Sequence, residues 1–116
     1  MNRGLEEPKR VRINVALTHS GDPNLVYIGR ECGRGGYNLK RSIWANPNSL
    51  NKYHDDRQAC LDDYYAYFMD PDSKKLQLLL SSLAGKTMMC FCERHELCHG
   101  DVISYIGEQM GLWVRE

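Results

Sequence analysis

Residues 87–101, TMMCFCERHELCHGD, hold three of the five cysteines and two of the four histidines of the 116-residue chain. The apolar residues 87–92 predict a buried strand, and residues 101–110 predict a helix that has Gly100 or Asp101 as its N-cap and stops at Gly111. Because side chains alternate along a strand, Cys90 and Cys92 are expected on one face. A strand end and a helix start therefore meet here, and ligands of α/β proteins usually bind at such an edge.

The segments around this stretch predict a small α/β protein. Alternating apolar positions over 11–17 and an apolar run over 25–28 predict two strands. Helices are predicted over 55–69, closed by Pro71, and over 73–84, between Asp72 as N-cap and Gly85. Residues 112–114 are expected to form a last short strand or a packed tail. The order predicts an α/β fold, a small layered domain with a mostly parallel sheet and flanking helices, over 11–116 after a flexible N-terminus over 1–10.

The helix over 55–69 carries apolar side chains at the spacing of one helical face. They are Leu61, Tyr64, Tyr65 and Phe68. For the tyrosines of this segment, Tyr64, Tyr65 and Tyr67, packing into the core is favoured over stacking on a base, because aromatic residues at helical spacing are more often core residues.

Composition narrows the class of protein. The formal net charge is zero, but residues 1–44 carry eight Lys/Arg against four Asp/Glu, and the rest carries seven against eleven. The basic surplus lies where an anion would be attracted, without the long basic tail typical of non-specific duplex binding. No apolar run is long enough to cross a membrane and none follows the polar N-terminus, so we expect a cytoplasmic protein without a membrane partner. Five irregularly spaced cysteines indicate reduced thiols or thiolate ligands.

Residues 29–47, GRECGRGGYNLKRSIWANP, form a second segment of interest, with four glycines and four Lys/Arg. Glycines let a backbone approach a ligand, and basic side chains form charge-assisted hydrogen bonds with phosphate, although the spacing fits neither standard phosphate-binding fingerprint. The alternative interpretation is a surface loop with solvated charges. The candidate ligand-binding residues are two that would line the pocket, Trp44 and Asn46, and five that would hold an anion: Gly29, Arg30, Arg34, Lys40 and Arg41.

The cysteines and histidines of 87–101 fit three kinds of chemistry. They offer the ligand types of a Cys3His zinc site, which would consist of Cys90, Cys92, Cys98 and His99. A cysteine at a helix start has a lowered pKa, so Cys98 is also a candidate nucleophile with His99 or His95 as its base. His99 and Asp101 are an alternative acid/base pair, which makes Cys98, His99 and Asp101 the catalytic candidates. Against all three stands simple packing, since free cysteine is often buried, and Cys90 in an apolar strand is favoured as core.

Several short motifs resemble the DUF4326 family of small bacterial and phage proteins. They are Val26-Tyr27-Ile28-Gly29-Arg30, Trp44-Ala45-Asn46-Pro47, Leu83-Ala84-Gly85-Lys86, Cys90-Phe91-Cys92 and Cys98-His99-Gly100-Asp101-Val102-Ile103. The resemblance runs from about Val26 to Ile106. It implies the same fold class and the same site residues, and it implies no reaction.

These observations lead to one functional hypothesis and one alternative. We expect the basic segment and the cysteine segment to form one site that binds a phosphate-bearing ligand, in the first place a nucleotide or nucleotide derivative. Whether the protein is an enzyme stays open, with hydrolysis or group transfer at the nucleotide as the reaction class. The alternative is a non-catalytic zinc-stabilised module that contacts nucleic acid or a protein partner through the basic loop.

Overall fold

The computed structural model describes residues 6–47, 56–92, 96 and 98–114. It has a three-stranded parallel sheet in the order β1-β3-β2, made of β1 (Lys9–Arg12), β2 (Leu25–Tyr27) and β3 (Thr87–Cys90). The helices are α1 (Val15–Thr18), α2 (Arg57–Met69), α3 (Lys74–Leu79) and α4 (His99–Gln109), with 3-10 turns η3 (Pro71–Ser73) and η4 (Leu80–Leu83). The expected α/β fold with a parallel sheet and flanking helices is confirmed.

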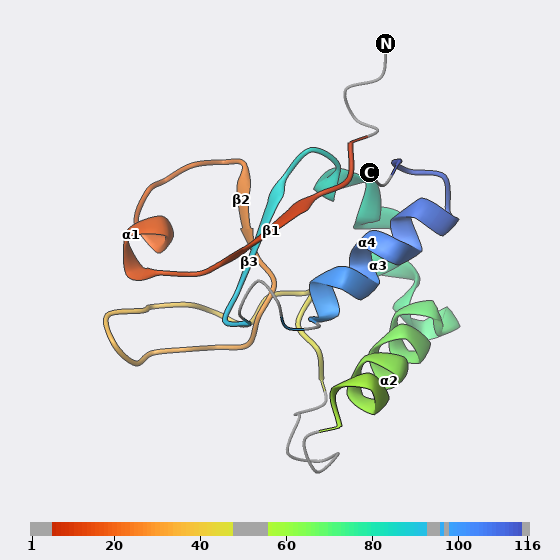
Figure 1. Cartoon of the computed structure of the whole chain (residues 1–116), viewed down its shortest axis with the longest axis horizontal. Helices are drawn as coiled ribbons and strands as arrows, with labels where there is room; N and C mark the ends of the chain where they lie inside the picture. The colour runs from red at the N-terminus through yellow and green to blue at the C-terminus, as the bar shows by residue number, and fades with distance from the viewer. Residues whose placement is uncertain (1–5, 48–55, 93–95, 97, 115–116) are drawn as a thin grey trace.

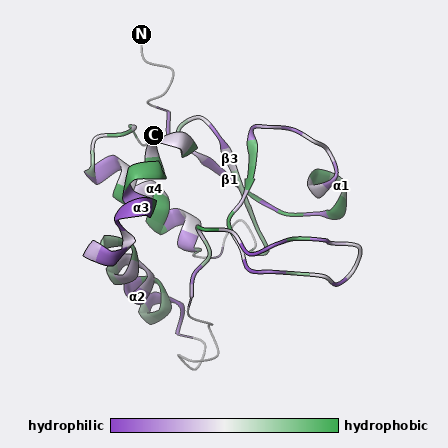
Figure 2. Cartoon of the chain, turned by 180° about the vertical axis from the view of Figure 1, so that it is seen from behind, coloured by the Kyte–Doolittle hydropathy of each residue, from purple (hydrophilic) through white to green (hydrophobic). Residues whose placement is uncertain are grey.

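The core lies between the sheet and the helices α2, α3 and α4. Figure 1 shows α2, α3 and α4 gathered on one side of the strands, and α1 with the loop over 29–47 on the other. β3 is central, and Met88 and Cys90 from this strand belong to the same buried cluster as residues from α2, η4 and α4. Figure 2 shows both hydrophobic and hydrophilic residues along α2 and α4, and the buried residues of α2 are Cys60, Leu61, Tyr64 and Phe68.

The first predicted strand is wrong in its extent. β1 begins at Lys9, so Lys9 and Arg10 lie in the sheet rather than in a loose N-terminal segment, and it ends at Arg12. Val15, Ala16 and Leu17, expected as strand, belong to the short helix α1. The Asn14 side chain accepts a hydrogen bond from the Leu17 amide at 2.9 Å and caps this helical turn.

The second predicted strand and the first predicted long helix are close to the observed elements. β2 ends at Tyr27, one residue short of the predicted 25–28. In α2 the Asp56 side chain caps the Ala59 amide at 3.1 Å, and Leu61, Tyr64 and Phe68 are buried as predicted. Tyr65 is 39% exposed, so its assignment to the core was wrong. Its ring instead lies beside Tyr105 of α4.

The predicted helix over 73–84 is broken into three parts. The turn η3 precedes α3, and η4 follows it before Gly85, whose φ of +73° suits a helix stop. Asp72 is not the N-cap of α3, since that position is held by Ser73. Leu76, Leu80 and Leu83 are buried, whereas Leu79, at the end of α3, is 38% exposed.

The predicted strand over 87–92 ends two residues earlier than expected, and the predicted helix over 101–110 begins two residues earlier. β3 ends at Cys90, so Cys92 lies beyond the strand. α4 begins at His99 with Cys98 as its N-cap, which corrects the expectation of Gly100 or Asp101. After α4 the residues 112–114 form a packed tail: the buried Trp113 donates from Nε1 to the Ser104 carbonyl at 2.9 Å, and Val114 bridges to Glu6.

Within the described ranges, no helix is both long and apolar enough to cross a membrane.

Candidate functional site

A cleft of about 570 Å³ opens beside the carboxyl ends of β2 and β3. Both segments that the sequence singled out contribute to it, as do three residues near the start of α2. Its lining consists of Tyr27, Gly29, Arg30, Glu31, Cys32, Gly33, Arg34, Asn46, Arg57, Cys60, Leu61, Cys90, Phe91, Cys92, Cys98 and His99. The parallel strands explain this position, because their carboxyl ends lie at the same edge of the sheet.

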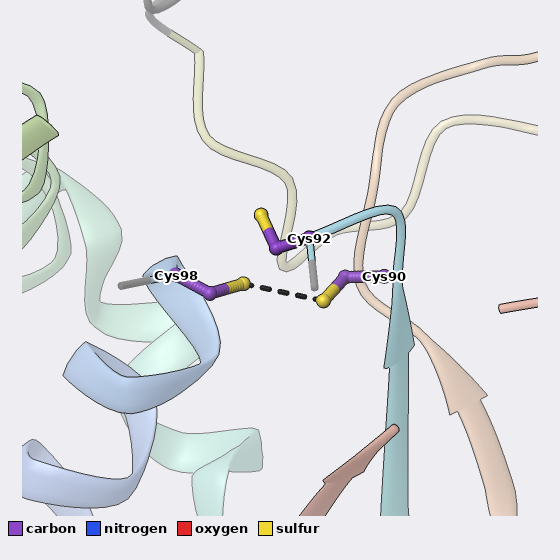
Figure 3. A group of neighbouring side chains, drawn as sticks. All are labelled: Cys90, Cys92 and Cys98. Atoms are coloured by element: carbon purple, nitrogen blue, oxygen red, sulfur yellow. Dashed lines mark hydrogen bonds between the residues drawn. The ribbon is translucent and has the colours of Figure 1, made fainter. Parts of the chain in front are cut away.

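Three thiols converge on one wall of the cleft. Cys90, Cys92 and Cys98 form what we call the three-cysteine cluster, and their sulfur atoms all lie within 4.8 Å of one another. Figure 3 shows how they meet: Cys90 comes from the end of β3, Cys92 from the segment after it, and Cys98 from the start of α4. The Cys90 and Cys98 sulfurs are 3.3 Å apart. All three are free thiols in the structure.

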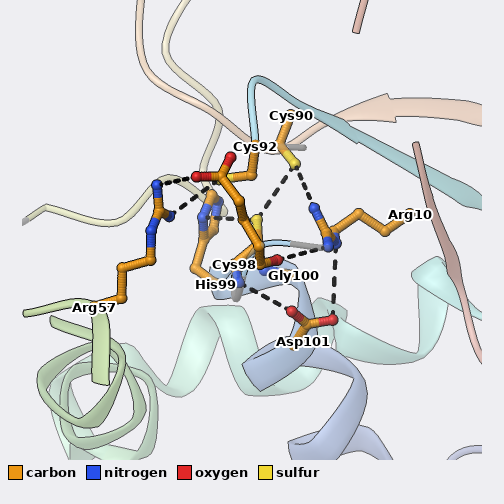
Figure 4. Close-up of polar contacts among 9 residues, drawn as sticks. Arg10, Arg57, Cys90, Cys92, Cys98, His99, Gly100 and Asp101 are labelled. Carbon is orange, nitrogen blue, oxygen red and sulfur yellow. Dashed lines mark hydrogen bonds and ion pairs between the residues drawn. The ribbon is translucent and has the colours of Figure 1, made fainter. Parts of the chain in front are cut away.

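Two arginines point at these sulfurs from different elements (Figure 4). Arg10 of β1 donates from Nη1 to Cys90 Sγ at 3.6 Å and from Nη2 to the Glu96 carbonyl at 2.9 Å. Arg57 of α2 donates from Nη1 to Cys92 Sγ at 3.9 Å and forms an ion pair with the Glu96 carboxylate at 2.7 Å. Arg10 is also paired with Asp101 and Arg57 with Glu96, so thiolates are favoured here by the hydrogen bonds that the two guanidinium groups donate to sulfur.

The three thiols do not share negative charge equally. Hydrogen bonds from Cys92, Cys98 and Arg10 lower the pKa of Cys90. Hydrogen bonding to Cys90 raises the pKa of Cys92 and of Cys98, since each donates its proton toward that sulfur. Cys90 is therefore the preferred thiolate of the cluster, and Cys98 acts as a donor to it rather than as the most acidic thiol.

His99 lies beside the cluster with a defined tautomer. Its Nε2 is 2.6 Å from the Ile28 carbonyl oxygen, which only accepts, so Nε2 carries the hydrogen. Burial lowers the pKa of His99, which keeps the ring neutral and leaves a lone pair on Nδ1. Nδ1 lies 3.7 Å from Cys98 Sγ, so the imidazole faces that thiol.

The structure brings most, but not all, of the predicted site residues to the cleft. Four of the seven predicted ligand-binding residues line it, namely Gly29, Arg30, Arg34 and Asn46, and so do the four predicted metal ligands. Lys40, Arg41, Trp44 and Asp101 do not line it.

Three of these four residues, Trp44, Asp101 and Arg41, have contacts elsewhere in the structure. Trp44 is only 4% exposed and stacks on Phe68 in the core, with ring centroids 6.0 Å apart. Asp101 accepts the Cys98 backbone N–H at 2.9 Å as part of the cap of α4, and its other oxygen pairs with Arg10 at 3.7 Å. Arg41 lines a second hollow beside α3.

Sequence reasoning missed several residues of the site. Arg10 would have been identified if the first strand had been predicted to begin at residue 9. It then lies in the strand that pairs with β3 up to Cys90. Arg57 follows directly after the Asp56 cap, so it lies at the end of α2 that faces the cleft. Cys60 lies one helical turn further on and accepts a hydrogen bond from the Asn46 side chain at 3.3 Å.

Comparison with known proteins identifies the family of the chain. The model for a domain of unknown function, DUF4326, matches residues 11–109. A curated relative, uncharacterized protein R718 of Acanthamoeba polyphaga mimivirus, is 34% identical over 85 residues, which is 67% of this chain and 62% of that protein. The matched region thus spans less than two thirds of that relative, which comes from neither a bacterium nor a phage. No solved structure matches significantly. Because the family model matches most of the chain, the chain belongs to the DUF4326 family.

Proposed function

We propose that the cleft binds a small phosphate-bearing ligand, a nucleotide or nucleotide derivative. The observation that carries the proposal is that three arginines and an exposed aromatic ring line the same cleft at the carboxyl edge of a parallel sheet. Its volume of about 570 Å³ lies within the range of small-molecule sites.

The anionic part of the ligand would bind Arg30 and Arg34, because Arg57 is already paired with Glu96. Glu31 is the one carboxylate among the described lining residues, so these two arginines leave an excess of positive charge on the wall. Arg30 donates from Nε to the Asn46 carbonyl at 3.3 Å, which orients its guanidinium without using the two terminal nitrogens. Guanidinium groups form bidentate, charge-assisted hydrogen bonds with phosphate, which supports a phosphate over a neutral ligand.

The base of the ligand would stack on Phe91. This ring is 40% exposed although it lies directly after the buried β3, and it lines the cleft. Tyr27 and Tyr37 contact it edge to face, with ring centroids at 6.3 and 5.1 Å, and so hold it in place. Stacking of a base on an aromatic side chain contributes about 1–3 kcal/mol.

If the protein is an enzyme, hydrolysis or group transfer at the bound nucleotide is the reaction class to assay first. Of the three catalytic candidates, Cys98 and His99 line the cleft and face each other, while Asp101 supports the cap of α4. A neutral imidazole with its lone pair on Nδ1 suits the role of a general base.

The test is a binding assay with matched arginine variants. Nucleoside mono-, di- and triphosphates, the parent nucleosides and inorganic phosphate are titrated by calorimetry and by thermal shift. Arg30→Ala is expected to weaken binding of the best nucleotide by about tenfold or more, because a hydrogen bond to a charged group contributes about 1.5–3 kcal/mol. Arg41→Ala, which removes the same charge outside the cleft, is the control. Equal loss in both variants, or no binding of any member of the panel, would refute the proposal.

The zinc-stabilised module that contacts nucleic acid or a protein partner is the second candidate function. The convergence of three thiols supports it, since structural zinc sites are built from such ligands. It requires that removal of zinc by a chelator unfolds the protein, and that oligonucleotides or a protein bind while mononucleotides do not. The same panel, extended by oligonucleotides and repeated with a chelator, separates the two functions.

A further inference from the structure

We infer that Cys90, Cys92 and Cys98 bind a single Zn²⁺ ion as thiolates and leave its fourth coordination position facing the cleft. The inference does not depend on the identity of the ligand proposed above. It concerns a metal site with an open position, in contrast to a closed structural site.

The spacing of the three sulfurs suits one tetrahedral ion. With Zn–S bonds of about 2.3 Å, the sulfurs of a tetrahedral site lie about 3.8 Å apart. The cluster has all three sulfurs within 4.8 Å and its closest pair at 3.3 Å, so small side-chain rotations suffice to reach the required spacing. Thiolates are soft ligands, which favours zinc over magnesium or calcium.

The fourth position is open because the three ligands belong to the wall of the cleft. All three cysteines line it, and no fourth carboxylate, imidazole or thiol of the described residues joins them within 4.8 Å. His99 is the nearest candidate, but its Nε2 is committed to the Ile28 carbonyl, and its Nδ1, 3.7 Å from Cys98 Sγ, does not lie within 4.8 Å of all three sulfurs. Three protein ligands and one exchangeable position are the pattern of catalytic zinc sites.

Charge around the cluster also fits an ion with three thiolates. Three thiolates and one Zn²⁺ together carry a charge of about −1, which would be costly in a partly buried place without nearby cations. Arg10 and Arg57 supply them, since each donates to one of the ligand sulfurs from a different element. Such hydrogen bonds to ligand atoms orient them and tune the metal.

Cobalt substitution tests the site directly. Reduced, chelator-treated protein is titrated with Co²⁺, and the expected result is one equivalent bound, with intense sulfur-to-cobalt charge-transfer absorption and the visible bands of a tetrahedral ion. Addition of azide or imidazole is expected to change the visible bands, because an open position exchanges its ligand. Absence of charge-transfer absorption would overturn the site, and bands unchanged by both additives would overturn the open position.

Serine variants assign the ligands, and the chain provides its own controls. Cys90→Ser, Cys92→Ser and Cys98→Ser are each expected to weaken Co²⁺ binding by at least about tenfold, the loss of one ligand bond. Cys32→Ser and Cys60→Ser remove thiols that line the same cleft and are expected to bind as the wild type does. Equal effects in both groups would refute the assignment.

The number of protein ligands is tested in the wild-type protein, which avoids variants that fail to fold. X-ray absorption of the zinc-loaded protein is expected to show three sulfurs at about 2.3 Å and one oxygen or nitrogen at about 2.0–2.2 Å. Cobalt binding is expected to persist in His95→Gln and in His99→Gln. If either histidine proves necessary for the fourth bond, the site is closed and the open position is refuted.

Discussion

At the scale of single residues, roles follow from contacts between segments that are distant in the sequence. The sequence grouped Cys90, Cys92 and Cys98 correctly, because all three lie within nine residues. It could not show that Cys90 is the preferred thiolate, because the pKa of Cys90 is lowered by hydrogen bonds from Cys92 and Cys98, which depend on how the three side chains meet, and then by one from Arg10, 80 residues away. The sequence also predicted Trp44 as a pocket residue. Its burial against Phe68 depends on how α2 packs, which a local pattern does not contain.

The tail after α4 gives a prediction at this scale. A methyl group at Gly107 would lie 1.9 Å from Trp113 Cζ2, so Gly107→Ala cannot keep the buried tryptophan in its place. Overpacking of this kind costs about 1–3 kcal/mol, and we expect a lower free energy of unfolding by that amount in urea. Gly33→Ala is the matched control, since nothing lies within 4 Å of its added methyl group. Equal stability of the two variants would show that Trp113 does not pack on α4.

At the scale of elements, local signals predicted the elements that they control. Gly85 and Gly111 mark helix ends as predicted, because a positive φ at the end of a helix acts within a few residues. The prediction of a strand over 11–17 was wrong because alternating apolar residues fit both a strand and a chain that turns at Asn14. The pairing of β1 with β3 decides between them, and a pattern within one segment does not contain that pairing.

The cap of α4 separates a structural from a catalytic role for Asp101. Its carboxylate accepts the Cys98 amide at 2.9 Å and pairs with Arg10, and it does not line the cleft. Asp101→Ala is therefore expected to lower the free energy of unfolding by about 1–2 kcal/mol, the cost of a lost cap, and to leave nucleotide affinity within about twofold.

Urea unfolding and calorimetry on the same preparation check both parts of this prediction. Asp62→Ala removes an exposed carboxylate whose partner is Gln58 one turn away, and it is expected to cost less than about 0.5 kcal/mol. An Asp101→Ala variant as stable as Asp62→Ala, or one that loses nucleotide binding, would contradict the assignment of Asp101 to the cap.

At the scale of the whole molecule, the topology makes one cleft from separate segments. The sequence predicted that the segments over 29–47 and 87–101 meet, because both follow strands of a parallel sheet. It did not predict that α2 would contribute Arg57 and Cys60, since the packing of a helix against a sheet edge depends on the core as a whole. The motifs that carry the family resemblance include residues on this lining from four places in the chain: Gly29, Asn46, Cys90 and His99.

A single cleft built from distant segments predicts linked protection when a nucleotide binds. Amide hydrogen exchange is expected to slow together in peptides that contain Gly29–Arg34 and in those that contain Phe91 and Cys92 or Cys98 and His99, because these residues line the cleft. Peptides from α3 (Lys74–Leu79) are the internal control and should exchange at the same rate with and without ligand, since none of their residues lines it. The measurement is exchange followed by mass spectrometry at saturating nucleotide, with Arg30→Ala as the variant in which protection should weaken in both segments. Protection confined to one segment would mean that the ligand contacts only one wall, and the two segments would then be neighbours without forming a common binding site.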